Sequence, residues 1–136
     1  MLKIYCSTPF KHYKEMEDLV YLALCKSKTV DNHCKFILPQ CLESELESFV
    51  FSDLKMLEES DILLIHIPEP SVGACAELGY FKACNPTKPI IGYKCMIHPW
   101  IKHLCNFQID HVDQLVEILE TMILGKKEIS PYKQGG

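Results

Sequence analysis

The segment from Asp61 to Ile67 limits the folds open to this chain more than any other feature, because it is apolar almost throughout. A strand with one face in water alternates apolar and polar residues, whereas a strand buried on both faces does not. Pro68 and Pro70 end this segment, and Gly73 then introduces the next helical pattern. The sequence therefore predicts a central parallel strand that helices cover on both sides.

The rest of the chain repeats this alternation of short apolar runs and longer stretches with helical spacing. The alternation predicts one α/β domain over residues 1–124, with a parallel sheet of about five strands, helices on both faces and right-handed crossovers. Residues 125–136 form a polar tail that we expect to be frayed and flexible. The expected strands lie at 2–6, 34–38, 61–67, 88–93 and 107–109, and the expected helices at 12–26, 43–59, 73–84 and 112–124.

The charged residues narrow the choice of partners. The formal net charge is −4 and the pI is about 5.8, whereas nucleic-acid-binding domains normally present a basic face. All 14 basic residues are lysines, so no arginine can bind a phosphate or a carboxylate in bidentate fashion. We therefore expect a small-molecule ligand and no nucleic acid polymer. Any anion must be held by backbone N–H groups, hydroxyls, helix N-termini or lysine.

The eight cysteines contain no C-x-x-C pair, which is the usual mark of a zinc module. A disulfide framework is arithmetically possible, but several of these cysteines lie in apolar runs, where a thiol usually acts as a small buried hydrophobic group. We therefore expect no metal site, and a redox or metal protein is the weakest hypothesis. The first strand leaves no signal peptide and no apolar run reaches membrane-spanning length, so we expect a cytoplasmic protein. The cysteines are Cys6, Cys25, Cys34, Cys41, Cys75, Cys84, Cys95 and Cys105.

Two carboxylates interrupt apolar helical stripes. Glu77 shares a helix face with Ala74, Leu78 and Phe81. Asp53 interrupts the stripe of the preceding helix, which consists of Leu46, Phe49, Val50, Leu54 and Leu57. A carboxylate on a core-facing stripe is costly unless it is paired or opens into a cleft. Two of them on successive helices predict a site rather than a solvated surface.

Each carboxylate also has an ordinary structural explanation. Glu77 is expected within about the first turn of its helix, where a glutamate complements the helix dipole. Asp53 could pair with a lysine such as Lys55 or Lys82. For Glu77, the dipole favours the ionised form and desolvation by apolar neighbours favours the protonated form. An ionised but poorly solvated carboxylate is a good nucleophile toward an electrophilic sugar carbon.

The loops after the strands are the expected place for a ligand, because parallel α/β sheets bind ligands beyond the carboxyl ends of their strands, where the strand order reverses. Three loops qualify, at residues 7–12, 68–73 and 94–100. The first contains no glycine, and a dinucleotide site needs glycines there so that the backbone can approach the pyrophosphate. The sequence therefore argues against a site for NAD.

Several side chains near these loops could take part in binding. Tyr5 could aim its hydroxyl at either carboxylate, although a tyrosine on a strand is more often a core residue. Ser71 could bind a phosphate or sugar oxygen, or it could cap the following helix. His66 is expected to be a strand-end residue whose ring nitrogens have hydrogen-bond partners, rather than a catalytic base. His98 and Trp100 could stack on a nucleobase or form a subunit contact.

Four segments of the chain carry a resemblance to a known family, and they are Lys3-Ile4-Tyr5, Asp53-Leu54, Ser60-Asp61-Ile62-Leu63-Leu64, and Gly73 with Glu77-Leu78-Gly79-Tyr80. Over roughly residues 2–93 the chain resembles the nucleoside 2-deoxyribosyltransferase family. This resemblance implies a flavodoxin-like, Rossmann-like α/β fold, action on the N-glycosidic bond of deoxyribonucleosides, and no metal or cofactor. By this resemblance Glu77 matches the nucleophile that forms a covalent deoxyribosyl ester, and Asp53 and Tyr5 match residues that orient the glutamate and contact the sugar.

The residue at position 71 distinguishes the branches of that family. Transferases that exchange bases on free nucleosides usually carry an aspartate there, whereas Ser71 is similar to the branch that hydrolyses deoxynucleoside 5′-monophosphates. A hydroxyl removes like-charge repulsion toward a phosphate. However, that branch also has glycine and arginine in the loop after its first strand, and residues 7–12 contain neither. The substrate contacts would come from Ser7, Thr8, Ser71 and Gly73, with Lys11 as a further phosphate ligand.

The first hypothesis is therefore an enzyme of nucleotide metabolism, acting in purine or pyrimidine salvage, that cleaves the N-glycosidic bond of a deoxynucleoside or its 5′-monophosphate. Transfer to a second base and hydrolysis are its two variants. The alternative is a catalytically inactive module of the same fold that binds or senses nucleotides. Related enzymes are homo-oligomers, and aromatic residues such as Phe49, Phe51 and Trp100 are compatible with a dimer or larger assembly.

Overall fold

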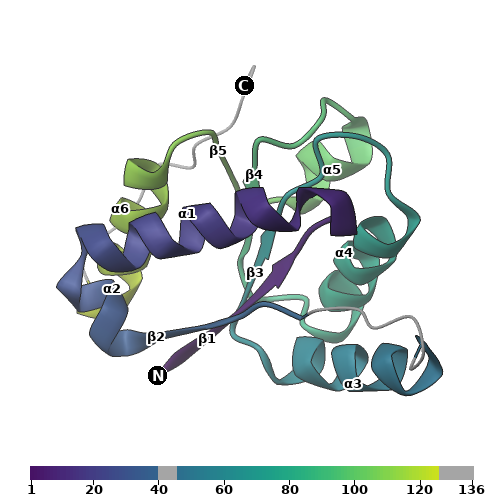
Figure 1. Ribbon diagram of the computed structural model, residues 1–136, viewed down its shortest axis with the longest axis horizontal. Helices are drawn as coiled ribbons and strands as arrows, with labels where there is room; N and C mark the ends of the chain where they lie inside the picture. The colour runs from purple at the N-terminus through teal and green to yellow at the C-terminus, as the bar shows by residue number, and fades with distance from the viewer. Residues whose placement is uncertain (40–45, 126–136) are drawn as a thin grey trace.

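A five-stranded parallel sheet forms the centre of the protein in the computed structural model, which describes residues 1–39 and 46–125 (Figure 1). The order in the sheet is β2-β1-β3-β4-β5, and every pair of neighbouring strands is parallel. The expected α/β fold is therefore confirmed. The strands are β1 (Leu2–Ser7), β2 (Cys34–Ile37), β3 (Ile62–Ile65), β4 (Ile90–Tyr93) and β5 (Phe107–Ile109).

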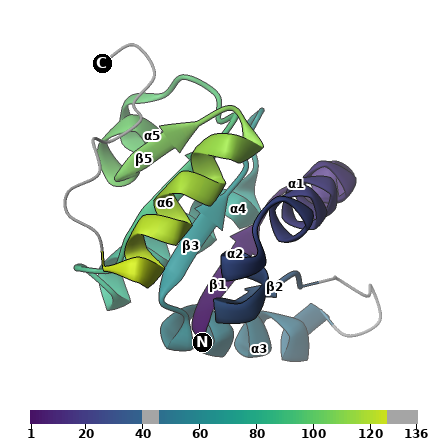
Figure 2. The ribbon, with the colours of Figure 1, turned by 90° about the vertical axis from the view of Figure 1, so that its left-hand side faces the viewer.

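Helices cover both faces of this sheet (Figure 2). One face carries α1 (Tyr13–Lys26), α2 (Lys28–His33) and α6 (Val112–Leu124). The other face carries α3 (Leu46–Glu59), α4 (Val72–Cys84) and α5 (Pro99–Leu104). A single 3-10 turn, η1 (Phe10–His12), precedes α1. None of the helices in the described ranges combines the length and the apolar character that a membrane span requires.

Side chains alternate between the two faces along each strand, and this alternation determines which helix each residue can reach. Ile4 and Cys6 of β1 pack in the core under α1 and α6. Tyr5 packs in the core under α3 and α4. Ser7 lies two residues beyond Tyr5 and shares its side. Two hydroxyl groups at the carboxyl end of β1 therefore face helix α4.

The order of the strands reverses at β1. From β1 the chain passes through α1 and α2 to β2 at the edge of the sheet, and it then returns through α3 to β3 on the other side of β1. The helix after β1 and the helix after β3 consequently lie on opposite faces. A crevice forms where such connections diverge, and ligands of open parallel sheets bind there.

The sequence prediction differs from the structure in two short helices. Helices α2 and α5 have six residues each, which is fewer than helical periodicity can resolve. Both begin at a side-chain cap, since Ser27 Oγ accepts the Val30 N–H and His98 Nδ1 accepts the Trp100 N–H. The central strand is also shorter than the expected 61–67. Residues 43–45 of the expected third helix, and 126–136 of the expected tail, lie outside the described residues.

Candidate functional site

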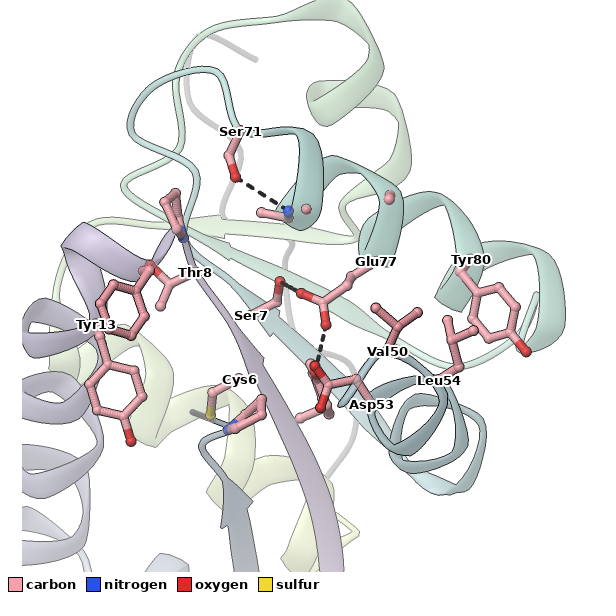
Figure 3. A pocket seen from close by; sticks show the side chains of 17 residues that line it. Cys6, Ser7, Thr8, Tyr13, Val50, Asp53, Leu54, Ser71, Glu77 and Tyr80 are labelled. Atoms are coloured by element: carbon pink, nitrogen blue, oxygen red, sulfur yellow. Dashed lines mark hydrogen bonds between the residues drawn. The ribbon is translucent and has the colours of Figure 1, made fainter. Parts of the chain in front are cut away.

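A pocket of about 460 Å³ opens at the carboxyl end of β1, between the loop that follows this strand and helices α3 and α4 (Figure 3). Its position is the switch point of the sheet. The loops at 7–12 and 68–73 both contribute to its lining, but the third candidate loop, 94–100, does not. All seven predicted site residues line the pocket: Tyr5, Ser7, Thr8, Asp53, Ser71, Gly73 and Glu77.

Glu77 lies at the centre of this pocket, where two hydroxyl groups hold its carboxylate (Figure 3). The Tyr5 hydroxyl donates to Oε2 at 2.5 Å, and the Ser7 hydroxyl donates to Oε1 at 2.7 Å. Burial raises the pKa of Glu77, and these two hydrogen bonds oppose the rise. Both oxygens of the half-buried carboxylate are thus fixed in direction by residues of the same strand.

The helix dipole does not explain the position of Glu77, contrary to the expected first-turn placement. Helix α4 starts at Val72, and its first turn contains no acidic residue. Glu77 lies in the second turn, beyond the range over which a helix N-terminus acts strongly. The charge of Glu77 is instead stabilised by Tyr5 and Ser7, whose contribution depends on strand β1 and could not be seen in the sequence around the helix.

Asp53 reaches the same pocket from helix α3 and lies beside Glu77 (Figure 3). Burial and the Glu77 charge raise the pKa of Asp53 from 3.8 to about 6, against a smaller opposing effect of the Tyr5 hydroxyl. Its Oδ1 is buried, and no described residue donates a hydrogen bond to it. The expected alternative of a lysine partner does not hold within the described residues, where Lys82 donates to the Pro86 carbonyl.

Tyr5 is fully buried, and burial together with the Glu77 charge raises its pKa far above the usual range. The phenol therefore stays protonated and acts as a hydrogen-bond donor to the carboxylate. Ser7 is equally buried. Neither hydroxyl has the freedom of a surface group, so the pair presents a fixed pattern of two donors to Glu77.

The remaining predicted residues stand at the rim of the pocket. Ser71 is the N-cap of α4, where its Oγ accepts the Ala74 N–H at 3.3 Å, and it also lines the pocket. The capping role is therefore observed, and the ligand-binding role stays a prediction for a residue that lines the pocket. Thr8 Oγ1 is buried and, within the described residues, has no hydrogen-bond partner. This hydroxyl is the polar group of the rim that a ligand could satisfy.

No lysine is among the described residues that line the pocket. Lys11 follows the first strand closely in the sequence, but it pairs with Glu69 and lies outside the lining. The pocket therefore presents two acidic side chains and several hydroxyls without a compensating cation. Such a lining is electrostatically unfavourable for a phosphate group.

Three other candidates lie away from the pocket. His66 is buried, and its Nδ1 donates to the Tyr93 carbonyl at 2.8 Å, which agrees with the expected satisfied strand-end residue. His98 caps α5, and Trp100 is 72% exposed. Phe51 on α3 is similarly exposed, while the side chain of Phe49 is outside the described part of the chain.

The sequence prediction missed the apolar and aromatic walls of the pocket. Tyr13 lies on one side of Glu77, and Val50, Leu54 and Tyr80 lie on the other (Figure 3). Val50 is 54% exposed and lines the pocket, so the expected stripe of α3 faces the pocket as well as the core. Tyr80 stands three residues after Glu77, a helical spacing that could have indicated it.

Comparison with solved structures identifies a protein of the same fold. The chain is similar to the 2-deoxyribosyltransferase from the psychrotolerant bacterium Bacillus psychrosaccharolyticus, with a TM-score of 0.67 and 17% sequence identity. The match covers 96% of this chain and 98% of that chain. No protein-family model matches the sequence, and no curated protein matches it. The likeness establishes the fold, and the chemistry has to be argued from the pocket.

Proposed function

We propose that this protein cleaves the N-glycosidic bond of 2′-deoxyribonucleosides through a covalent deoxyribosyl ester of Glu77. The observation that carries this proposal is the Glu77 carboxylate, which the Tyr5 and Ser7 hydroxyls hold inside the pocket. The fold shared with a 2-deoxyribosyltransferase supports a related glycosyl-transfer function. A carboxylate that is held rigidly and solvated by few groups suits attack on an anomeric carbon.

The reaction follows the logic of a retaining glycosidase, in two displacements. One oxygen of Glu77 bonds to C1′ as the C1′–N bond breaks, and the electron pair of that bond goes to the base nitrogen. Asp53, whose pKa of about 6 leaves it partly protonated near neutral pH, supplies a proton to the leaving base. An acceptor base or water then attacks C1′, the ester bond breaks, and its electron pair returns to Glu77. The proton of the acceptor passes to Asp53.

The pocket favours a free nucleoside over a nucleotide as the substrate. Among the described lining residues, Asp53 and Glu77 are acidic and none is basic. A 5′-phosphate would meet this negative charge without a lysine partner. The hydroxyls of Thr8 and Ser71 suit the hydroxyls of a deoxyribose, since a hydroxyl can both donate and accept.

The walls of the pocket suit a planar base. Phe10, Tyr13 and Tyr80 contribute aromatic rings, and Val50 and Leu54 contribute aliphatic groups. Apolar walls with a few fixed polar groups are the usual composition of small-molecule sites. The base would lie against these walls while the sugar faces Glu77, which would leave C1′ within reach of the carboxylate.

A single assay tests this function. The purified protein is incubated with each deoxynucleoside and each 5′-monophosphate, with and without a second base, and the products are separated by chromatography. We expect free base or exchanged nucleoside from the nucleosides and markedly less from the monophosphates. Free base without an acceptor identifies a hydrolase, and exchanged nucleoside identifies a transferase. Faster release from the monophosphates would contradict the proposed preference for nucleosides.

The covalent ester can be detected directly by intact-protein mass spectrometry after acid quenching. The native protein should gain the mass of one deoxyribosyl group, and Glu77→Gln should gain none while keeping its circular dichroism spectrum. Activity of Glu77→Gln should fall by at least about a thousandfold. Nucleotide binding without any base release over long incubation would instead identify the inactive binding module.

A further inference from the structure

Three ionisable side chains outside the pocket meet at the carboxyl edge of the sheet: His12, Glu15 and His66, which we call the His–Glu–His cluster. His12 ends η1, Glu15 lies in the first turn of α1, and His66 follows β3. His66 is two residues after Leu64, so it points to the face that carries α1, opposite to the face of Glu77. The proposed chemistry does not use these residues.

The nitrogen and oxygen atoms of this cluster are close enough to bind one ion. One ligand atom from each residue lies within 4.8 Å of the others. His66 Nε2 is 2.5 Å from Glu15 Oε2, and His12 Nδ1 is 3.0 Å from Glu15 Oε1. Ligands of a tetrahedral zinc ion stand about 2.0–2.2 Å from the metal and hence roughly 3.4 Å from one another. Small side-chain adjustments would bring the three groups to that spacing.

The orientation of His66 is already that of a metal ligand. Its Nδ1 donates to the Tyr93 carbonyl at 2.8 Å, which directs Nε2 toward Glu15. Ligating histidines almost always use their second nitrogen in this way, because the hydrogen bond fixes the tautomer and the ring position. His66 is only 1% exposed, so its ring cannot turn away into solvent. The hydrogen bond between Nε2 and Glu15 requires a proton, and a metal ion could take the place of that proton.

The imidazole of His12 has a ring nitrogen that is available to a ligand. His12 Nε2 is buried and makes no hydrogen bond within the described residues. The nearest acidic oxygen is Oε1 of Glu69 at 3.6 Å, which is too long for a hydrogen bond. Glu69 also pairs with Lys11. Once a metal ion has replaced the Nε2 proton of His66, both imidazoles are neutral, and the two carboxylates and one lysine leave a net charge of −1 that the cation would offset.

We propose that the His–Glu–His cluster is a binding site for one divalent transition-metal ion, with Zn²⁺ as the expected occupant. Two imidazoles and a carboxylate are a common zinc ligand set, and the cluster contains no thiolate. The ion would tie the start of α1 to the end of β3. The loops beside these ligands supply Thr8 and Ser71 to the pocket, so the metal would restrain both sides of its rim.

No local pattern in the sequence indicates this site, because its ligands are not closely spaced cysteines. The ligands are instead a helical pair, His12 and Glu15, and a residue more than fifty positions later. Only the parallel pairing of β1 with β3 brings His66 next to the start of α1, as the backbone bond from His66 N–H to the Ser7 carbonyl shows.

Zinc titration of the purified, metal-stripped protein tests the proposal. We expect one Zn²⁺ per chain by calorimetry and an upward shift of Tm that saturates at this ratio. Glu15→Gln and His12→Ala should each weaken the binding more than about tenfold. Both side chains are partly exposed, so these variants should fold even if a variant of buried His66 does not. Glu17→Gln is the matched control, because Glu17 lies on the same helix and pairs with Lys14.

Cobalt distinguishes this site from the cysteines. Co²⁺ bound by nitrogen and oxygen ligands lacks the sulfur-to-metal charge-transfer absorption that thiolates produce. We expect visible d–d bands without that absorption, and we expect Glu15→Gln to remove them while Glu17→Gln does not. Binding that shows thiolate absorption and is unchanged in Glu15→Gln and His12→Ala would overturn the proposal, as would the absence of Zn²⁺ binding to the native protein.

Discussion

At Glu77, burial and two hydrogen bonds act in opposite directions on the charge that the proposed reaction needs. Burial raises the pKa of the carboxyl group, and the Tyr5 and Ser7 hydroxyls lower it. Tyr5 makes the larger of the two opposing contributions. The two donors of strand β1 therefore favour the ionised form of the carboxylate, which burial disfavours. This balance can be tested by removing the Tyr5 hydroxyl.

Removing the Tyr5 hydroxyl should lower the rate and move the pH dependence. A hydrogen bond to a charged group contributes about 1.5–3 kcal/mol, so Tyr5→Phe should lower kcat roughly 10- to 100-fold with little change in KM. The acid limb of kcat/KM should move to higher pH, because the Glu77 carboxyl loses a group that lowers its pKa. Steady-state rates from pH 4 to 8 measure both effects. Tyr21→Phe, on the exposed surface of α1, serves as the control and should change neither.

Asp53 should make the folded protein less stable above about pH 6 than it would be with a neutral side chain. Well below pH 3.8 the group is protonated in folded and unfolded chains alike, and the contribution of its neutral form to stability is fully present. As the pH rises from 3.8 through about 6, the unfolded chain releases this proton first and that contribution is lost. The shift in pKa corresponds to about 3 kcal/mol, which solvent screening at this partly exposed position reduces to about 1–2 kcal/mol.

Asp53→Asn should therefore raise the free energy of unfolding by about 1–2 kcal/mol at pH 8 and leave it nearly unchanged at about pH 3. Urea denaturation at the two pH values measures the difference. The same substitution should lower kcat, because the amide cannot exchange a proton with the leaving base. A variant that is less stable than the native protein at pH 8 would show that the Asp53 charge is satisfied by a partner and does not destabilise the fold.

At the scale of the secondary-structure elements, Ser71 determines where helix α4 begins. Its Oγ accepts the Ala74 N–H, and the loop before it enters the helix in an extended conformation. Ser71→Ala should lower the free energy of unfolding by about 1 kcal/mol, because one N–H at the helix start loses its acceptor. Ser71→Asn should retain most of the stability, because asparagine caps helices about as well as serine. Denaturant unfolding of the three proteins at one pH makes the comparison.

The sequence indicated the long elements well and the local position of Glu77 poorly. The uninterrupted apolar run between turn residues indicated the strand Ile62–Ile65, and the helical spacing around Leu78 indicated α4. The start of α4 was expected at Gly73 because glycine and proline interrupt helices, but the Ser71 cap lets the helix begin at Val72. The helix therefore begins one residue earlier than expected, and Glu77 lies one residue farther from its N-terminus. A capping hydrogen bond is a geometric fact that spacing alone does not determine.

At the scale of the whole molecule, the pocket depends on contacts between distant parts of the sequence. Tyr5, Asp53 and Glu77 were each predicted from a local pattern or from a family resemblance, and the strand order brings them to one pocket. The aromatic walls were not predicted, because Phe10 and Tyr13 carry no local signal that separates them from core or surface residues. The His–Glu–His cluster escaped prediction for the same reason, since its members meet only in the folded sheet.

The distribution of the cysteines gives a test of the fold as a whole. None of the seven described cysteines forms a disulfide. Cys25, Cys75 and Cys84 are exposed, and the other four are buried in the two cores. Burial raises the pKa of Cys6 above the usual range, and it raises the pKa of Cys34 and Cys95 to about 11, so little thiolate forms at these positions at neutral pH.

Alkylation followed by peptide mapping should therefore modify Cys25, Cys75 and Cys84 in the native protein within minutes. The buried thiols should react only when the chain unfolds, at rates slower by about a thousandfold or more, because the unfolded population is that small for a stable domain. Adding denaturant should bring every position to the same rate. Rapid native labelling of Cys6 or Cys95 would contradict the packing of β1 and of the segment after β4. A Tm that rises when reductant is removed would indicate a disulfide that the described residues do not contain.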